Sequence, residues 1–209
     1  MNNQVNVIIA GAGMGDLIVS CALYDTAIDD APDNGIVFNI SRLEKDILTI
    51  EDVEECDLSG IQYAVNATLH DTEASFAFDE KCKKMGIMVI HAINLGMATF
   101  ITVEKSKGYP FCEVVKRGTK NFKYSLGKYI SQYGQFWQTP VPWIDEAIEK
   151  AKATTTTENS NKDHDLFHQQ SIGAWITAGY CVNILRDLAK GKEVKFFPKF
   201  YLSPLLEEL

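Results

Sequence analysis

The sequence lacks several features that would indicate a specialised class of protein. Its 209 residues contain no apolar run long enough to span a membrane, and no basic segment precedes the first apolar stretch. We therefore expect neither a membrane span nor a signal peptide. No internal repeat is present. The five cysteines form no C-x-x-C pair, which argues against a zinc knuckle, and we expect reduced thiols in a cytoplasmic protein.

Basic residues are also in short supply. The chain has 20 Lys and Arg residues against 28 Asp and Glu residues, for a formal net charge of −8. A chain this acidic repels a long polyanion, so we expect no nucleic-acid partner. The apolar fraction of 46% is typical of a globular protein with a buried core. We expect a single domain over residues 1–209.

The most informative stretch that is present, VNVIIAGAGMGD, lies near the N-terminus. An apolar segment, Val5–Ala10, leads directly into Gly11, Gly13 and Gly15. This order predicts the strand, turn and helix of a nucleotide-binding unit, in which Gly11 permits the turn and Gly13 lets a phosphate approach the backbone. The sixth position of the G-x-G-x-x-G pattern is Asp16, whose carboxylate repels a phosphate unless a metal or basic group intervenes. The alternative is an ordinary turn that only looks like this fingerprint.

Apolar segments along the first half alternate with helical patterns. The expected strands are Val5–Ala10, Ile36–Ile40, Ile61–Ala67, Ile87–Ile93 and Thr99–Val103. The clearest helix is Thr72–Met85, which Asp71 or Thr72 can cap and which Gly86 follows. Strand–helix–strand order predicts an α/β fold with a Rossmann-like, mainly parallel sheet and helices on both faces.

The second half has a different pattern. Periodicity is weak over residues 108–138, and helices are expected near residues 143–153 and 169–190. Between them, TTTTENSNKDHD has no apolar residue, so we expect a flexible loop near residues 154–168. His164 and His168 lie there at a spacing that could ligate a metal on a helix face, but the loop-like sequence disfavours this.

Three stretches together resemble the ThiF/MoeB/HesA family, which includes the ubiquitin-activating enzymes. They are GAGMGD, the block IQYAVNATLHDTEASFAFDEKCKKMGIMVIHAINLGMATFITVE and the segment SIGAWITAGYCVNILRDLAKG. The second is similar to the family's strand ending in D-x-T-D-N followed by a helix and a strand, and the third to its C-terminal helix. The pieces occur in the family's order and cover about half of the chain.

The resemblance implies a function. Members of the family bind ATP with Mg²⁺ and transfer AMP to the C-terminal carboxylate of a small ubiquitin-like or sulfur-carrier protein. Charge stabilisation around the phosphates by metal and basic groups supplies the catalysis. The resemblance also suggests a homodimer.

This chain departs from the family pattern at several positions. The family has an acidic residue after its second strand that holds the ribose, then an N-x-x-R segment and a lysine that contact the phosphates. Here the interval is too short for that block, and Asn39, Arg42 and Lys45 are the nearest substitutes. Leu69 stands at the place of the magnesium-associated aspartate, and Asp71 follows two positions later.

The resemblance and the glycine turn define the predicted site. The catalytic candidates are Asp71 and Arg42, and no metal ligand is assigned. The predicted nucleotide-binding residues are Gly11, Gly13, Gly15, Asn39, Asn66 and Thr68. Asn66 and Thr68 are included because the carboxyl ends of strands are where open α/β sheets bind ligands.

Three functions remain open at this stage. The first is an adenylyltransferase, and the second is a degenerate relative that binds a nucleotide or a protein without activating it. The third is an NAD(P)-dependent oxidoreductase, in which Ser41 and Arg42 would hold a 2′-phosphate. Among other candidates, His91 could be a general base, but a hydrogen-bonded structural histidine is the favoured interpretation. Cys112 has no activating neighbour in the sequence, and Cys181 is expected in the core.

Overall fold

The computed structural model describes residues 4–28, 35–70, 72–113, 122–155 and 170–204. The elements follow in the order β1 (Gln4–Ala10), α1 (Gly13–Ile28), β2 (Val37–Leu43), α2 (Ile50–Glu55), β3 (Tyr63–Asn66), α3 (Glu73–Lys84), β4 (Met88–Asn94), β5 (Ala98–Glu104), a 3₁₀ turn at Phe111–Glu113, α4 (Phe122–Phe136), α5 (Pro142–Thr155), α6 (Ser171–Ala189) and β6 (Tyr201–Pro204). The five expected strands are confirmed, with ends shifted by up to three residues.

The six strands form one mixed sheet in the order β2-β1-β3-β4-β5-β6. The first four are parallel to one another, whereas β5 runs antiparallel to β4, and β6 antiparallel to β5. The predicted Rossmann-like, mainly parallel α/β sheet is therefore confirmed. Because β2 and β3 lie on opposite sides of β1, the strand order reverses there, and such a reversal is where open sheets place their ligands.

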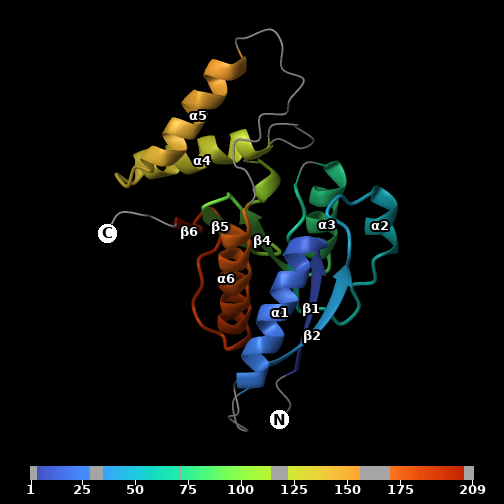
Figure 1. Ribbon diagram of the computed structural model, residues 1–209. Helices are drawn as coiled ribbons and strands as arrows, with labels where there is room; N and C mark the ends of the chain where they lie inside the picture. The colour runs from blue at the N-terminus through green and yellow to red at the C-terminus, as the bar shows by residue number, and fades with distance from the viewer. Residues whose placement is uncertain (1–3, 29–34, 71, 114–121, 156–169, 205–209) are drawn as a thin grey trace.

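Helices cover both faces of the sheet, as expected from the sequence. Figure 1 shows α1 and α6 side by side on one face, α2 and α3 on the other, and α4 with α5 beyond the edge of the sheet. Along β1 the buried side chains alternate between the two layers. Val7 and Ile9 pack with α1 and α6, whereas Ile8 and Ala10 pack with α2 and α3. This two-residue period, with both sets apolar, explains why the strand reads as an unbroken apolar run.

Strand β2 continues to Leu43, three residues beyond the expected end at Ile40. It lies at the edge of the sheet, and its residues are exposed or half-buried in alternation. An edge strand needs few apolar residues, so the apolar pattern ends before the pairing with β1 does. The consequence is that Arg42 lies at the end of a strand, where its side chain can reach α1.

Helix α4 lies within residues 108–138, where the sequence shows only weak periodicity. Phe122, Leu126 and Ile130 recur at every fourth position and are buried in a cluster with α5 and β5. The lysines, tyrosines and glycines on the other faces conceal this period in the sequence. Close packing explains the glycine at position 134, because a Cβ there would lie 2.6 Å from the carbonyl oxygen of Thr139 in the turn to α5.

The remaining predictions for the second half have mixed outcomes. Helices α5 and α6 confirm the expected helices near residues 143–153 and 169–190, and Cys181 lies in the core with no exposed surface. Thr154 and Thr155 belong to α5, and the rest of the predicted loop, with His164 and His168, lies outside the described residues. No helix in the described part of the chain combines the length and hydrophobicity that a bilayer span requires.

Candidate functional site

A cavity of about 480 Å³ opens at the carboxyl ends of β1, β3 and β4. We call it the glycine-turn pocket. Its wall combines the start of α1, the segment after β2, the segment after β3, the end of β4 and the first turns of α4 and α6. The lining residues are Gly13, Met14, Asp16, Leu17, Asp46, Ala67, Thr68, Leu69, Ala92, Ile93, Asn94, Phe122, Lys123 and Ala174. The pocket therefore lies at the reversal of strand order, where the sequence predicts a ligand.

The three glycines of the turn differ in how much space surrounds them. Gly11 has a φ of 125°, and a Cβ there would lie 2.6 Å from the carbonyl oxygen of Ala67, so only glycine fits. A Cβ on Gly15 would touch Ile9 Cγ2 at 3.4 Å, which reflects close packing of α1 on β1. A Cβ on Gly13 would meet no described atom within 4 Å. Gly13 thus leaves space at the pocket wall, whereas the other two serve the fold.

The carboxylate of Asp46 occupies the N-terminus of α1. The backbone N–H of Ala12 donates a hydrogen bond to Asp46 Oδ1 at 2.9 Å, and that of Gly13 donates to the same oxygen at 3.3 Å. The first N–H groups of a helix have no partner within the helix, so an acceptor there is favourable. These are also the groups that a nucleotide phosphate would use. Sequence reasoning missed Asp46, because it lies 30 residues beyond Asp16.

Arg42 lies beside the turn but is already paired. Its Nη1 is 2.7 Å from Asp16 Oδ1 and 3.3 Å from Glu44 Oε1, and its Nη2 donates to the carbonyl oxygen of Ala12 at 3.4 Å. The basic group that could offset the carboxylate of Asp16 is therefore present. Glu44 follows directly after β2, the place that the family resemblance assigns to a ribose-holding acid. The early end predicted for β2 concealed it.

Asn66 and Thr68 lie at the carboxyl end of β3, as predicted, but their polar atoms bond mainly within the protein. Asn66 Nδ2 donates to Asp79 Oδ1 at 2.8 Å and to the carbonyl oxygen of Ser75 at 3.1 Å. Asn66 Oδ1 accepts from Thr68 Oγ1 at 2.8 Å. Thr68 lines the pocket, whereas Asn66 is fully buried behind it. Asn66 therefore supports the pocket wall.

The remaining predicted site residues are not gathered at the pocket. Asn39 lies in the first half of β2, paired with Asn6, and its Nδ2 donates to Asn6 Oδ1 at 3.0 Å. Lys45 forms an ion pair with Asp52 of α2. Asp71 lies outside the described residues. The structure thus brings together Gly11, Gly13, Gly15, Arg42, Asn66 and Thr68 and places Asn39 elsewhere.

A network of buried ionisable side chains lies behind the pocket. His91 of β4 and His70 are in contact, with 3.2 Å between His91 Nδ1 and His70 Nε2. His91 Nε2 lies 3.1 Å from Glu104 Oε2 of β5, and Glu104 also pairs with Lys83 of α3. Asp79 Oδ2 lies 3.9 Å from His91 Nδ1 and has no hydrogen-bond partner among the described residues. All five side chains are buried or nearly so.

The hydrogen bonds restrict the protonation states of the two histidines. The carbonyl oxygen of Thr68 lies 2.8 Å from His70 Nδ1 and can only accept, so this nitrogen carries a proton. If His70 is neutral, its Nε2 accepts from His91 Nδ1, and His91 Nε2 donates to Glu104. His91 is then doubly protonated and cationic. The structural interpretation of His91 is confirmed, because both ring nitrogens have partners.

The pKa shifts agree with this assignment. Burial, aided by the charge of His91, lowers the pKa of His70 to about 3. Burial opposes the charged form of His91, but Asp79 and Glu104 together raise its pKa. Burial raises the pKa of Asp79 to about 7, against the influence of His91. Burial opposes the ionised form of Glu104, but His91 and Lys83 lower its pKa.

Asp79 makes the stability of the protein depend on pH. The pKa of Asp79 rises from 3.8 to about 7 on folding. The stabilisation of the folded state by protonated Asp79 is therefore complete below pH 3.8 and is lost as pH rises through 7. We expect Asp79→Asn to abolish this pH dependence. Between pH 4 and pH 8, the free energy of unfolding of wild type should therefore fall by on the order of 2 to 4 kcal/mol relative to that of the variant. Urea denaturation at several pH values measures the difference.

The matched control is Asp57→Asn. Asp57 is exposed, and a hydrogen bond from Ser59 lowers its pKa, so it titrates below this pH window. The urea midpoint of this variant should change with pH in the same way as that of wild type from pH 4 to pH 8. Parallel curves for Asp79→Asn and wild type would contradict the assignment of a raised pKa to Asp79.

Among the described residues around this site, we find neither grouped metal ligands nor an activated thiol. In the described ranges no three His, Cys, Asp or Glu side chains are grouped to hold a metal ion. Burial raises the pKa of the Cys112 thiol, and Glu104 and Glu113 raise it further, which disfavours a thiolate nucleophile.

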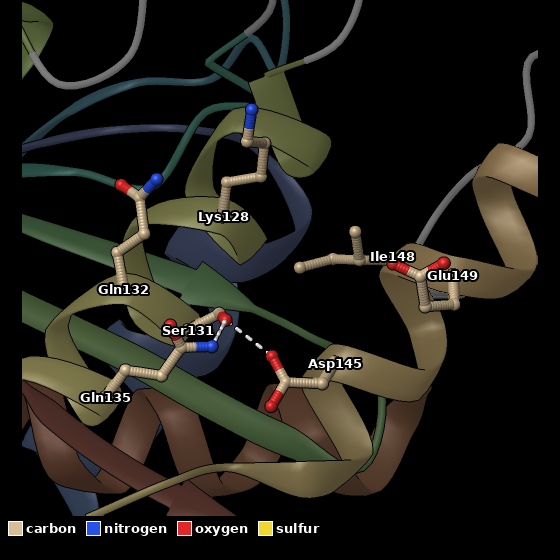
Figure 2. A pocket seen from close by; sticks show the side chains of 7 residues that line it. All are labelled: Lys128, Ser131, Gln132, Gln135, Asp145, Ile148 and Glu149. Carbon is tan, nitrogen blue, oxygen red and sulfur yellow. Dashed lines mark hydrogen bonds between the residues drawn. The ribbon is translucent and has the colours of Figure 1, made fainter. Parts of the chain in front are cut away.

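Two other hollows lie on the α4–α5 side of the molecule. One is polar, has a volume of about 350 Å³ and lies between these helices. Figure 2 shows its lining side chains, among which Ser131 Oγ donates to Asp145 Oδ1. The other, of about 510 Å³, is lined by aromatic residues such as Tyr129, Tyr133 and Trp137. Neither is lined by the glycine turn, so the glycine-turn pocket is the site that matches the sequence pattern.

This chain is similar to known proteins in its fold and not in its sequence. No protein-family model matches the sequence, and no curated protein matches it. The structure is similar to selenomethionine PaaA, with a TM-score of 0.54 and 13% identity over 99% of this chain and 71% of PaaA. The two proteins share a fold. Membership of the ThiF/MoeB/HesA family stays a prediction.

Two structures of E. coli MccB give lower scores. MccB with AMPCPP and selenomethionine MccA has a TM-score of 0.49 and 11% identity, over 98% of this chain and 65% of MccB. MccB with ATP has a TM-score of 0.46 and 9% identity, over 98% and 64%. This chain thus spans less than two thirds of the length of MccB.

Proposed function

We propose that this protein binds an adenine nucleotide in the glycine-turn pocket. The observation that carries the proposal is the position of the pocket, which opens against the first turn of α1 at the reversal of strand order. Its volume of about 480 Å³ is in the range of small-molecule sites. The backbone N–H groups at the start of α1 suit a phosphate, because they lack partners within the helix.

The residues around the pocket support specific roles. Gly13 leaves room for a phosphate beside the backbone, since an added Cβ there would meet no described atom within 4 Å. Glu44, directly after β2, is placed to accept a hydrogen bond from a ribose hydroxyl. Apolar side chains such as Met14, Leu17 and Ile93 offer a surface for the base.

The same contacts favour binding over transfer of AMP. Transfer needs positive charge around the phosphates. Arg42, the basic group beside the turn, is already paired with Asp16 and Glu44. We therefore propose a nucleotide-binding relative of the ThiF-like proteins that does not activate a substrate by itself.

Adenylation of a carboxylate is the second candidate function. Lys123 on the pocket wall favours it, because a lysine there brings a cation to the nucleotide. A small carrier protein and a second copy of this chain are the partners that the family resemblance suggests, and both stay predictions. Pyrophosphate exchange with ATP and a carrier protein distinguishes the two functions: exchange above background would support adenylation and contradict binding alone.

The substitution Gly13→Ala tests nucleotide binding without disturbing the fold. Its methyl group would enter the space at the pocket wall, so we expect the affinity for ATP to fall by about tenfold or more, as for a lost contact of about 1.4 kcal/mol. Thermal stability should stay equal or rise slightly, because alanine replaces glycine in a helix. Isothermal titration calorimetry measures the affinity.

Gly179→Ala is the matched control. It adds the same methyl group to α6 at a position where no described atom lies within 4 Å and which does not line the pocket. Its affinity for ATP should equal that of wild type. If wild type binds neither ATP nor adenosine, the proposed function is wrong.

A further inference from the structure

We propose that Asp46 is an internal competitor for phosphate, and that a nucleotide binds with its phosphates at the start of α1 only by displacing the Asp46 carboxylate. This inference rests on the proposed function and concerns the regulation of the same pocket. Because of this competition, a phosphate-bearing ligand binds only at a concentration high enough to displace the Asp46 carboxylate. A nucleoside without phosphates does not compete with Asp46.

The Asp46 carboxylate holds the position that a phosphate would occupy at the start of α1. Asp46 Oδ1 accepts from the N–H groups of both Ala12 and Gly13, at 2.9 and 3.3 Å. Gly13 is the first residue of α1 and Ala12 directly precedes it, and the N-terminus of this 16-residue helix carries a partial positive charge. A phosphate and a carboxylate use the same donors and the same dipole, so they exclude each other there.

The backbone on either side of Asp46 is held by the rest of the protein. The carbonyl oxygen of Asp46 accepts from the N–H of Leu69 at 3.2 Å, and Leu48, two residues later, is buried in the core. The backbone of the segment is therefore anchored. Asp46 itself is solvent-exposed and lines the pocket. Rotation of this one side chain clears the two N–H groups without unfolding the loop.

Negative charge predominates around the glycine turn. Asp16, Glu44 and Asp46 place three carboxylates near the turn, and Arg42 pairs with the first two. The carboxylate of Asp46 is thus the one that faces an incoming phosphate directly. Like charges at such short range repel, so removing this carboxylate should strengthen phosphate binding more than any change to the base or ribose contacts.

The test compares ATP, adenosine and inorganic tripolyphosphate as ligands of wild type, Asp46→Ala, Asp46→Asn and Asp57→Ala by isothermal titration calorimetry. Asp57→Ala is the matched control. It removes the same negative charge and a similar hydrogen bond from a backbone N–H to a carboxylate. In this case the N–H of Ser59, in the turn before β3, donates to Asp57 Oδ1. That turn precedes its strand and so lies away from the carboxyl ends of the strands, where the pocket opens. Asp46→Asn keeps an acceptor oxygen and decides the outcome if the alanine variant unfolds.

We expect Asp46→Ala to bind ATP and tripolyphosphate at least tenfold more tightly than wild type, with a smaller gain for Asp46→Asn. The affinity for adenosine should change by less than twofold, and Asp57→Ala should match wild type for all three ligands. ATP affinities of both Asp46 variants within twofold of wild type would overturn the inference and leave nucleotide binding intact. Failure of every variant to bind ATP and adenosine would instead remove the proposed function.

Discussion

The substitution Gly173→Ala should destabilise the protein by about 3 kcal/mol or more, because the added methyl group has no space. Gly173 lies in the first turn of α6, and its Cβ would lie 1.9 Å from the carbonyl oxygen of Gly96 and 2.4 Å from Asn94 Oδ1. Asn94 is the last residue of β4, and Gly96 lies in the short connection between β4 and β5. Urea denaturation of the variant and wild type measures the loss.

The contacts of this segment make relaxation difficult. Asn94 Nδ2 donates to the carbonyl oxygen of Gln170 at 3.0 Å, and Asn94 Oδ1 accepts from the N–H of Gly96 at 2.8 Å. The start of α6 is thus held on the connection, and a shift of either one breaks buried hydrogen bonds. Because Asn94 and Ala174 line the glycine-turn pocket, the same change should also distort the pocket wall.

Gly179→Ala separates this steric effect from helix propensity. It lies in the same helix, where an added methyl group meets no described atom within 4 Å. Alanine in a helix interior is favoured over glycine, so this variant should gain about 0.5 to 1 kcal/mol. Equal stability of Gly173→Ala and Gly179→Ala would refute the close approach of α6 to the sheet connection.

The substitution Glu104→Gln should lower the free energy of unfolding by about 3 to 5 kcal/mol. Glu104 is 2% exposed and is the counter-charge for both Lys83 and the cationic His91. The glutamine has nearly the same shape, so packing is preserved while the negative charge is lost. The cost arises because the positive charges remain buried without compensation.

A double-mutant cycle with Lys83→Met identifies the source of the loss. The double variant removes one positive and one negative charge together, so it should be less destabilised than the sum of the two single variants. The expected coupling is about 1 to 3 kcal/mol. If Glu104→Gln unfolds within 1 kcal/mol of wild type, the buried charges are not coupled as the distances indicate.

The glycine turn shows how far local sequence reasoning reaches. An apolar strand followed by Gly11, Gly13 and Gly15 predicts the turn, the helix and the place of the pocket, and all three are found. These features depend on residues next to one another in the chain. A left-handed backbone conformation at Gly11 and close packing at Gly15 are requirements that the local sequence expresses directly.

The charges around that turn could not be predicted in the same way. Arg42 was a candidate, but its pairing with Asp16 depends on the extension of β2 beyond its apolar residues. Asp46 reaches Ala12 and Gly13 only because β2 lies next to β1 in the sheet. Asn39 shares a strand with Arg42, yet it lies three residues closer to the start and pairs with Asn6.

The sequence by itself determined the first five strands, the helices α1, α3, α5 and α6, and the mainly parallel sheet with helices on both faces, since the apolar pattern of these segments records which faces are buried. The glycine pattern after the first strand determined the turn. Only the tertiary structure decided which ionisable groups meet: Asp46 at the start of α1, and His91 with Glu104 and Asp79 behind the pocket. The reason is physical. Burial and charge pairing join residues from separate strands and helices, and their energies depend on distances that no local pattern encodes.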